Sequence, residues 1–293
     1  AHEGAFGNNQ NVCQGGIVDL ANALTNRPDL IVSGHTHSLV NTVVNGIPIV
    51  QARSGGTALG IVDFVVQDGG RVARIRVETV WADRERPDSA VAAVVARASD
   101  QVRPLTERPV ATLGQDLTRR GDQYPLGDMV ADALREAAGA DIGLINNSGT
   151  RADLLAGSVN WGQLYEVLPF GNFVVKIPVT GAVLRQVLEH ALASNDTRVS
   201  VAGMTVRVDR TRPSGQRVAA IALADGRTVQ DDAVYLLATF DFLAAGGSGY
   251  SMLRNRPFTN TGIDELDAFI AWLRRQPQPI RAAEPFVPRI SDR

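Results

Sequence analysis

"GDMVADALREAAGADIGLINNSGTR", residues 127–151, sets the architecture of the larger part of the chain. Its first half spaces apolar residues three and four positions apart, which places them on one face of a helix: Met129, Val130, Ala133, Leu134 and Ala137. An apolar run at 141–145 is typical of a buried strand, and a polar, glycine-containing loop follows it. The stretch therefore predicts a helix at 127–138, a strand at 141–145 and a loop at the strand's end.

Further helices and strands follow this stretch. Helices are predicted after Asn160, from Thr180 and over 263–274, and strands over 173–179, 201–209, 217–223 and 233–239, with Asp225-Gly226 as the turn between the last two strands. Because helices and strands mix without a strict βαβ rhythm, the pattern favours α+β layers.

The first 80 residues have a different, β-rich pattern. A helix is predicted over 15–25 and a short buried strand over 29–34. Asn45-Gly46 lies between two apolar runs and predicts a hairpin, and Asp68-Gly69-Gly70 predicts a second one. Residues 81–110 then enclose an Ala/Val-rich stretch between charged ends, which Asp88 or Ser89 could cap as a linker helix.

The composition limits the classes of protein. The chain has 293 residues, 44% of them hydrophobic, and a net charge of -2. This length suits two ordinary domains. The charge offers no basic footprint for nucleic acid and no polybasic membrane patch, and no stretch approaches the roughly 20 apolar residues of a membrane span. We therefore expect neither a nucleic-acid partner nor a transmembrane span.

Three of the four histidines lie in two short glycine-bearing motifs: His2 in "AHEGA", and His35 and His37 in "GHTH". Imidazole is a common ligand of zinc and similar ions, and a loop after a strand can hold it rigidly. A His-x-His pair also occurs often by chance, so metal binding and solvated histidines are equally good interpretations of these residues alone. His190 lies within a predicted amphipathic helix, where a boundary histidine with satisfied hydrogen bonds is the better interpretation.

These motifs and the following "NTVVNGIPIVQARSGGTALGIVDFVV" resemble, in order, the closing third of the metallophosphatase domain in the 5'-nucleotidase family. The resemblance implies two divalent ions, Zn, Mn, Mg or Ca, with His2 and His35 as ligands of one ion and His37 of the other. The carboxylate ligands and the catalytic His of the family precede these motifs, so the resemblance places no catalytic residue in this chain. Because neutral imidazoles do not offset the charge of two ions, we expect the chain alone to be inactive.

The second part contains residues suited to holding a nucleotide. Asn146 and Arg151 lie in the loop "NNSGTR", Phe170 lies in "LPFGN", and Phe242 precedes a Gly246-Gly247 turn. Two loop-borne rings could stack on a base, and an arginine donates paired hydrogen bonds to phosphate. Taken singly, a core position for each phenylalanine and a solvated position for Arg151, one of 28 arginines, are the more frequent outcomes.

Residues 107–255 also resemble, in order, the C-terminal substrate-binding domain of the same family. The resemblance implies substrate contacts from six residues: Arg120, Asn146, Arg151, Phe170, Phe242 and Ser248. Phe170 and Phe242 would form a stacking pair, and Arg120, next to Arg119, would contact phosphate. Ser248 stands where family members commonly have Asp, which weakens the expected recognition of ribose because serine lacks the charge and reach of a carboxylate.

We therefore expect a mixed α+β and α/β chain. It would consist of a truncated metallophosphoesterase β-sandwich flanked by helices at 1–84, a helical linker at 85–106, and a layered α+β nucleotide-binding domain at 107–293. The resemblance implies part of a bacterial metallophosphoesterase that hydrolyses nucleotide phosphate esters and is periplasmic, cell-surface or secreted. A non-catalytic nucleotide-binding module, a 2',3'-cyclic phosphodiesterase and a UDP-sugar hydrolase are alternatives on the same scaffold.

Overall fold

The computed structural model describes residues 4–5, 13–70, 72–82, 86–193 and 199–292. The chain forms two compact units, residues 1–95 (unit 1) and 96–293 (unit 2). The division falls within helix α2 (Ser89–Thr106). The Asp88 carboxylate accepts hydrogen bonds from the backbone N–H groups of Ala90 and Val91 at 2.9 and 3.0 Å, and thereby caps the helix start. The helix expected here is present, and the finer domain boundaries stay predictions.

The described residues of unit 1 form one helix, one short strand and two hairpins. Its elements are α1 (Gly16–Ala23), β1 (Ile31–Val32), β2 (Leu39–Val44), β3 (Ile47–Ala52), β4 (Ala58–Val66) and β5 (Val72–Trp81). The first three strands form a sheet of order β1-β3-β2, and β4 pairs with β5. Asn45 and Gly46 have φ angles of 51° and 75°, as a two-residue hairpin turn requires. Both predicted hairpins are confirmed.

A five-stranded sheet of order β10-β7-β13-β9-β14 forms the centre of unit 2. Its strands are β7 (Ile142–Asn146), β9 (Phe173–Thr180), β10 (Val199–Ala202), β13 (Val234–Phe240) and β14 (Thr259–Asp264). β7 and β13 are parallel, and the other neighbours are antiparallel. Strands β7, β10 and β13 are largely buried, which explains their mostly apolar sequences, whereas the edge strand β14 is polar and has no buried residue.

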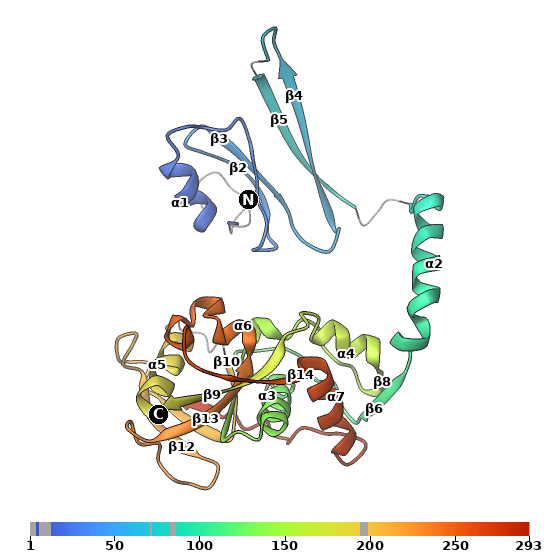
Figure 1. The fold of residues 1–293 in the computed structure, drawn as a ribbon. Helices are drawn as coiled ribbons and strands as arrows, with labels where there is room; N and C mark the ends of the chain where they lie inside the picture. Colours follow the sequence, from blue (N-terminus) through green and yellow to red (C-terminus); the bar gives the residue numbers. More distant parts are fainter. Residues whose placement is uncertain (1–3, 6–12, 71, 83–85, 194–198, 293) are drawn as a thin grey trace. The chain divides into compact units, whose positions relative to one another are not determined.

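Helices cover both faces of this sheet (Figure 1). α3 (Pro125–Ala138) and α7 (Glu265–Arg275) pack together on one face, and α5 (Gly181–Ala191) packs on the other. Unit 2 also contains the paired strands β6 (Pro109–Leu113) and β8 (Gly157–Asn160) and the helices α4 (Trp161–Val167) and α6 (Asp241–Ala244). The apolar face predicted for α3 is indeed its buried face, with Val130 and Leu134 fully enclosed.

The single strand predicted at 201–209 is wrong, because the chain breaks it at Gly203 into β10 and β11 (Met204–Val208). Gly203 has a φ of 72°, and a Cβ there would lie 2.2 Å from the backbone oxygen of Asp141, so only glycine fits. β11 leaves the central sheet and pairs with β12 (Val218–Leu223) and β15 (Ile290–Asp292). Residues on both sides of the glycine have strand character, so the periodicity does not reveal the break.

The turn at Asp225-Gly226 does not join the last two strands, contrary to the prediction. The N–H of Leu223 donates to the backbone oxygen of Arg227 at 2.8 Å, and the chain folds back into a bridge between Ala222 and Thr228. β12 therefore stays in the smaller sheet, whereas β13 enters the central one. A turn sequence such as Asp-Gly predicts where the chain reverses direction, but it does not predict with which strand the following strand pairs.

The mixed α+β class expected from the sequence is confirmed. Among the residues that the structure describes, none of the helices combines the length and the apolar character that crossing a bilayer requires.

The buried Asp128 makes the stability of unit 2 depend on pH. Burial raises the pKa of Asp128 from its ordinary value of 3.8 to about 7, against the opposing effect of Arg289. Between these values the folded chain binds more protons than the unfolded chain, so the stabilising contribution is full below about pH 4 and is lost by about pH 7. We expect the free energy of unfolding to fall over this range by at most about 1.4 kcal/mol per pH unit from this group, and Asp128→Asn to remove that fall. Urea unfolding between pH 4.5 and 7.5 measures it, and equal slopes for both proteins would contradict the prediction.

Candidate functional site

One end of the central sheet collects most of the candidate residues. Phe240 of β13 pairs with Val174 of β9, so β13 ends beside the start of β9. β7 runs parallel to β13, with Gly143 opposite Ala238, and ends at the same edge. The segments that continue from this edge carry Asn146, Arg151, Phe170, Phe242 and Ser248. Strand pairing thus brings together residues up to 102 positions apart, as for Asn146 and Ser248.

Asn146 offers an unused hydrogen-bond acceptor at this edge. The residue is 7% exposed, and its Nδ2 donates to the hydroxyls of Ser148 and Ser248, the latter at 3.2 Å. Its Oδ1 is buried and has no hydrogen-bond partner among the described residues. Leaving a buried acceptor unpaired costs about 1–3 kcal/mol, so any donor that reaches this enclosed oxygen would be bound favourably.

Phe170 and Phe242 are 55% and 48% exposed, so neither is a core residue. The guanidinium of Arg151 lies 5.8 Å from the centre of the Phe170 ring, within the range of a cation–π interaction. The same guanidinium donates to the backbone oxygen of Ser148 at 3.3 Å. The Phe170 ring and the Arg151 guanidinium therefore form one continuous surface that is apolar at the ring and positively charged at the guanidinium.

The ring of Phe242 rests on the glycine turn that follows α6. A Cβ at Gly247 would lie 2.5 Å from the ring, so the ring occupies space that any larger residue would need. Gly246 and Ser248 have φ angles of 88° and 51°, and the chain turns sharply at this point. The turn thus determines both the support of the ring and the position of the Ser248 hydroxyl.

His190 of α5 supports the same turn, a role that helical periodicity does not reveal. Its Nε2 lies 2.9 Å from the backbone oxygen of Ser248. A Cβ at Gly249 would lie 2.8 Å from the ring, so turn and ring are in close contact. Tyr250 meets the ring edge-on, with ring centres 4.7 Å apart, and burial raises the pKa of its phenol. The histidine is hydrogen-bonded, as interpreted from the sequence, but its partner belongs to the candidate site.

Glu265 fixes the loop that carries Phe170. This fully buried carboxylate accepts hydrogen bonds from the backbone N–H of Asn172 at 3.3 Å and from its Nδ2 at 3.0 Å. The backbone N–H of Glu265 donates in return to the Asn172 oxygen at 2.9 Å. Burial raises the pKa of Glu265, while the bonds from Asn172 lower it. An acidic residue at a helix start is ordinary, so no sequence pattern indicates this role.

Arg120 is exposed, and its position depends on the neighbouring Arg119. The Arg119 backbone N–H and Nε donate to Oδ1 of Asp153 at 2.9 and 3.2 Å, and its Nη1 donates to the backbone oxygen of Thr150 at 3.1 Å. The segment with both arginines is thereby tied to the loop that follows β7. Among the described residues, no contact places Arg120 against the two rings, so its membership of the site stays a prediction.

His35 and His37 lie on an exposed turn of unit 1. Their φ angles are 71° and 57°, in a region that residues other than glycine rarely adopt and that is enriched at functional sites. Between them, the Thr36 hydroxyl donates to the backbone oxygen of Ala5 at 2.7 Å and accepts from Nε2 of Gln51 at 2.8 Å. The turn therefore holds both imidazoles at the surface.

Gly4, in the first described segment, packs on this turn, but the described residues do not make up a metal site. A Cβ at Gly4 would lie 2.0 Å from the backbone oxygen of Gly34, so only glycine allows this approach. His2 lies outside the described residues. Within the described ranges, no group of three His, Cys, Asp or Glu side chains could hold a metal ion. The two described imidazoles do not by themselves fit a two-metal centre.

Comparison with known proteins identifies one family. The family described as "5'-nucleotidase, C-terminal domain" matches residues 95–255. The chain is 31% identical over 284 residues to Endonuclease YhcR of Bacillus subtilis, covering 93% of this chain and 23% of that protein. It is 26% identical over 279 residues to Cell wall protein Lmo0130 of Listeria monocytogenes, covering 86% and 36% respectively. The chain thus spans about a quarter to a third of these relatives.

A solved structure shares the fold. The 5'-nucleotidase precursor from Thermus thermophilus superposes with a TM-score of 0.69 at 24% identity, over 90% of this chain and 59% of that one. The matched family residues begin at 95, so the resemblance of residues 1–80 to a metallophosphatase domain stays a prediction.

Replacing Glu265 tests the support of the Phe170 loop. In Glu265→Gln, an amide NH2 group faces N–H donors, so at least one buried hydrogen bond is lost and we expect the free energy of unfolding to fall by about 1–3 kcal/mol. Urea unfolding followed by circular dichroism measures this change. Glu166→Gln, on the exposed side of α4, is the control and should change stability by less than about 0.5 kcal/mol. Equal effects of the two variants would refute a special role for Glu265.

Proposed function

Since the chain belongs to the 5'-nucleotidase C-terminal domain family, we propose that residues 107–293 bind a nucleotide at the end of the central sheet. One observation carries the proposal: two exposed rings and an unpaired buried amide oxygen lie on segments that leave the same edge of the sheet. This combination offers apolar surface to a base and hydrogen bonds to a sugar, whereas core phenylalanines would be buried.

Each candidate residue then has a role. Phe170 and Phe242 stack on the base, a contact worth about 1–3 kcal/mol per base. The Oδ1 of Asn146 and the hydroxyl of Ser248 bind the sugar. Arg120 and Arg151 bind phosphate through charge-assisted hydrogen bonds. Because serine makes one uncharged contact, we propose that selection between ribose and other sugars is weak.

The proposed reaction is hydrolysis of nucleotide phosphate esters to nucleoside and phosphate. It belongs to a protein that also contains the remaining part of a metallophosphatase domain, in which His2, His35 and His37 would contribute imidazole ligands to two divalent ions. Such ions supply activated water for attack on phosphorus. We propose that the present chain alone binds nucleotide without hydrolysing it, since two described imidazoles leave the charge of the ions uncompensated.

Two other assignments concern the substrate and the location. A 2',3'-cyclic phosphodiesterase or a UDP-sugar hydrolase would use the same groups, and the name of the Bacillus relative, an endonuclease, adds nucleic acid as a substrate to test. A cell-surface, periplasmic or secreted location is supported by the Listeria relative, which is named a cell wall protein.

Binding of AMP and adenosine tests the nucleotide site. We expect Phe170→Ala and Phe242→Ala each to lower the affinity for both ligands by about 5- to 150-fold, which corresponds to the loss of one stacking contact. The control is Phe258→Ala, because Phe258 is 47% exposed and precedes β14 where Thr259 pairs with Lys176, away from the edge with the loops. Isothermal titration calorimetry measures the affinities. Binding that is unchanged in the first two variants, or equally lowered in the third, would exclude the stacking role.

Phosphate release tests the reaction. The protein expressed from its full reading frame should release phosphate from AMP in the presence of a divalent ion, and His35→Ala should lower the rate at least about 10-fold, since even residues behind metal ligands change activity by that factor. The chain of 293 residues should show no release. 2',3'-Cyclic AMP, UDP-glucose and duplex DNA serve as parallel substrates, and their consumption is measured directly because their first hydrolysis leaves a phosphate monoester and no free phosphate. A rate with any of these well above that with AMP would replace the proposed substrate.

A further inference from the structure

Residues 118–124 form a short segment that is held on both sides of an exposed tip. On one side, Arg119 is bound to Asp153 and to the backbone of Thr150. On the other side, the backbone oxygen of Asp122 accepts a hydrogen bond from Nδ2 of Asn147 at 2.7 Å. Arg120 and Gly121 lie between these anchors and are exposed. Hydrogen bonds on both sides of Arg120 therefore hold the backbone of this segment, and we call these two attachments the clamp.

The two adjacent arginines differ in what their guanidinium groups contact. The group of Arg119 is engaged with Asp153 and Thr150. Across the part of the chain that the structure describes, no hydrogen bond or ion pair involves the side chain of Arg120. An exposed guanidinium without a partner keeps its paired donors available for an anion. Arg120 is thus better suited than Arg119 to bind phosphate.

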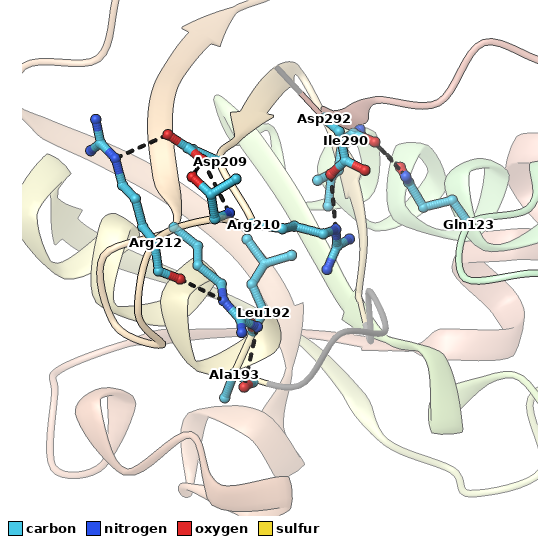
Figure 2. Close-up of polar contacts among 10 residues, drawn as sticks. Gln123, Leu192, Ala193, Asp209, Arg210, Arg212, Ile290 and Asp292 are labelled. Atoms are coloured by element: carbon cyan, nitrogen blue, oxygen red, sulfur yellow. Dashed lines mark hydrogen bonds and ion pairs between the residues drawn. The ribbon is translucent and has the colours of Figure 1, made fainter.

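Gln123 connects the tip to the end of the chain (Figure 2). Its Oε1 accepts from the backbone N–H of Ile290 at 2.8 Å, and its Nε2 donates to the backbone oxygen of the same residue. Ile290 belongs to β15, which pairs with β11. The Gln123 amide thus hydrogen-bonds both the N–H and the C=O of Ile290, as the backbone of a neighbouring strand would, and this holds the segment in place.

β15 is itself firmly attached. Arg289 forms a bidentate ion pair with Asp132 at 2.9 and 2.6 Å and donates to the backbone oxygen of Val201 at 2.7 Å. Asp292 pairs with Arg210 at 2.8 Å, as Figure 2 shows. This strand lies beyond residues 95–255, which match the family. The support for the tip therefore comes from a part of the chain outside the matched domain.

We propose that Gln123, held by the C-terminal strand β15, is a positioning residue that fixes Arg120 for binding the phosphate of the nucleotide. The inference rests on the nucleotide-binding role proposed above. Without these attachments, the backbone at Arg120 and Gly121 would be mobile in the free protein and would become ordered only when the nucleotide binds. Ordering the backbone of one residue lowers the affinity by about 5- to 30-fold. Adenosine lacks the phosphate, so its binding does not use the tip.

A double-mutant cycle tests the coupling. Calorimetry with AMP and with adenosine is carried out on the wild-type chain, Gln123→Ala, Arg120→Ala and the double variant. We expect both single variants to have a lower affinity for AMP, by about 5- to 30-fold in Gln123→Ala. The affinity for adenosine should be unchanged in each variant. The double variant should bind AMP no more weakly than Arg120→Ala, because a positioning residue has no effect once its target is gone.

Two further variants separate positioning from stability. Gln123→Met keeps the length and packing of the side chain but makes neither bond to Ile290, and should reproduce the loss for AMP if the alanine variant folds poorly. Gln278→Ala is the matched control, because Gln278 also binds backbone across the C-terminal segment, accepting from the Thr112 N–H at 2.7 Å. It should leave the AMP affinity unchanged.

The outcomes distinguish the inference from the proposed function. A wild-type chain that binds neither AMP nor adenosine refutes the proposed function and the inference with it. If the wild-type chain binds AMP, the inference alone is overturned by any of three results: normal AMP binding by both Gln123 variants, an equal loss for adenosine, or losses that multiply in the double variant. An Arg120→Ala variant with wild-type AMP affinity overturns it as well.

Discussion

The pairing of β9 with β13 is the constraint on which the candidate site depends. Because Phe240 lies opposite Val174, the loop before β9 and the helix after β13 leave the sheet side by side. Val174 packs into the layer of α3 and α7, and its neighbour Val175 packs into the layer of α5. A slip of one residue would send each side chain into the layer built for the other. Burial on both faces therefore fixes the register, and the register places Phe170 and Phe242 at one edge.

The site combines fixed backbone with available side chains. His190, Glu265 and Gln123 each bind the backbone of a loop or strand, and each supports a segment that carries a candidate contact. The groups left available are the two exposed rings and, as proposed, the Arg120 guanidinium and the Asn146 oxygen. Supporting residues that lock a loop reduce the ordering cost of binding. This division of roles explains why the supporting residues are polar and partly or wholly buried.

Local patterns predicted much of the fold and part of the site. The helix at Pro125–Ala138 and the Asn45-Gly46 hairpin depend on neighbours a few positions away, and both are present. The strand predicted across Gly203 failed because the glycine is required by a close approach to Asp141, a residue distant in the chain. The family resemblance predicted that Phe170 and Phe242 lie in the site, whereas hydrophobicity alone favoured a core position for both rings. His190 and Glu265 carried no signal, since each looks ordinary on its own helix.

The sequence by itself determined the class of fold, the main helices and hairpins, and the kinds of aromatic and polar group in the loops, because periodicity and turn residues act over a few positions. The tertiary structure alone decided which of these groups lie at one end of the central sheet and what holds them. His190 reaches the Ser248 turn across 58 positions, and Glu265 reaches the Phe170 loop at Asn172 across 93. Such contacts exist only after the sheet has set its register, and no local pattern encodes them.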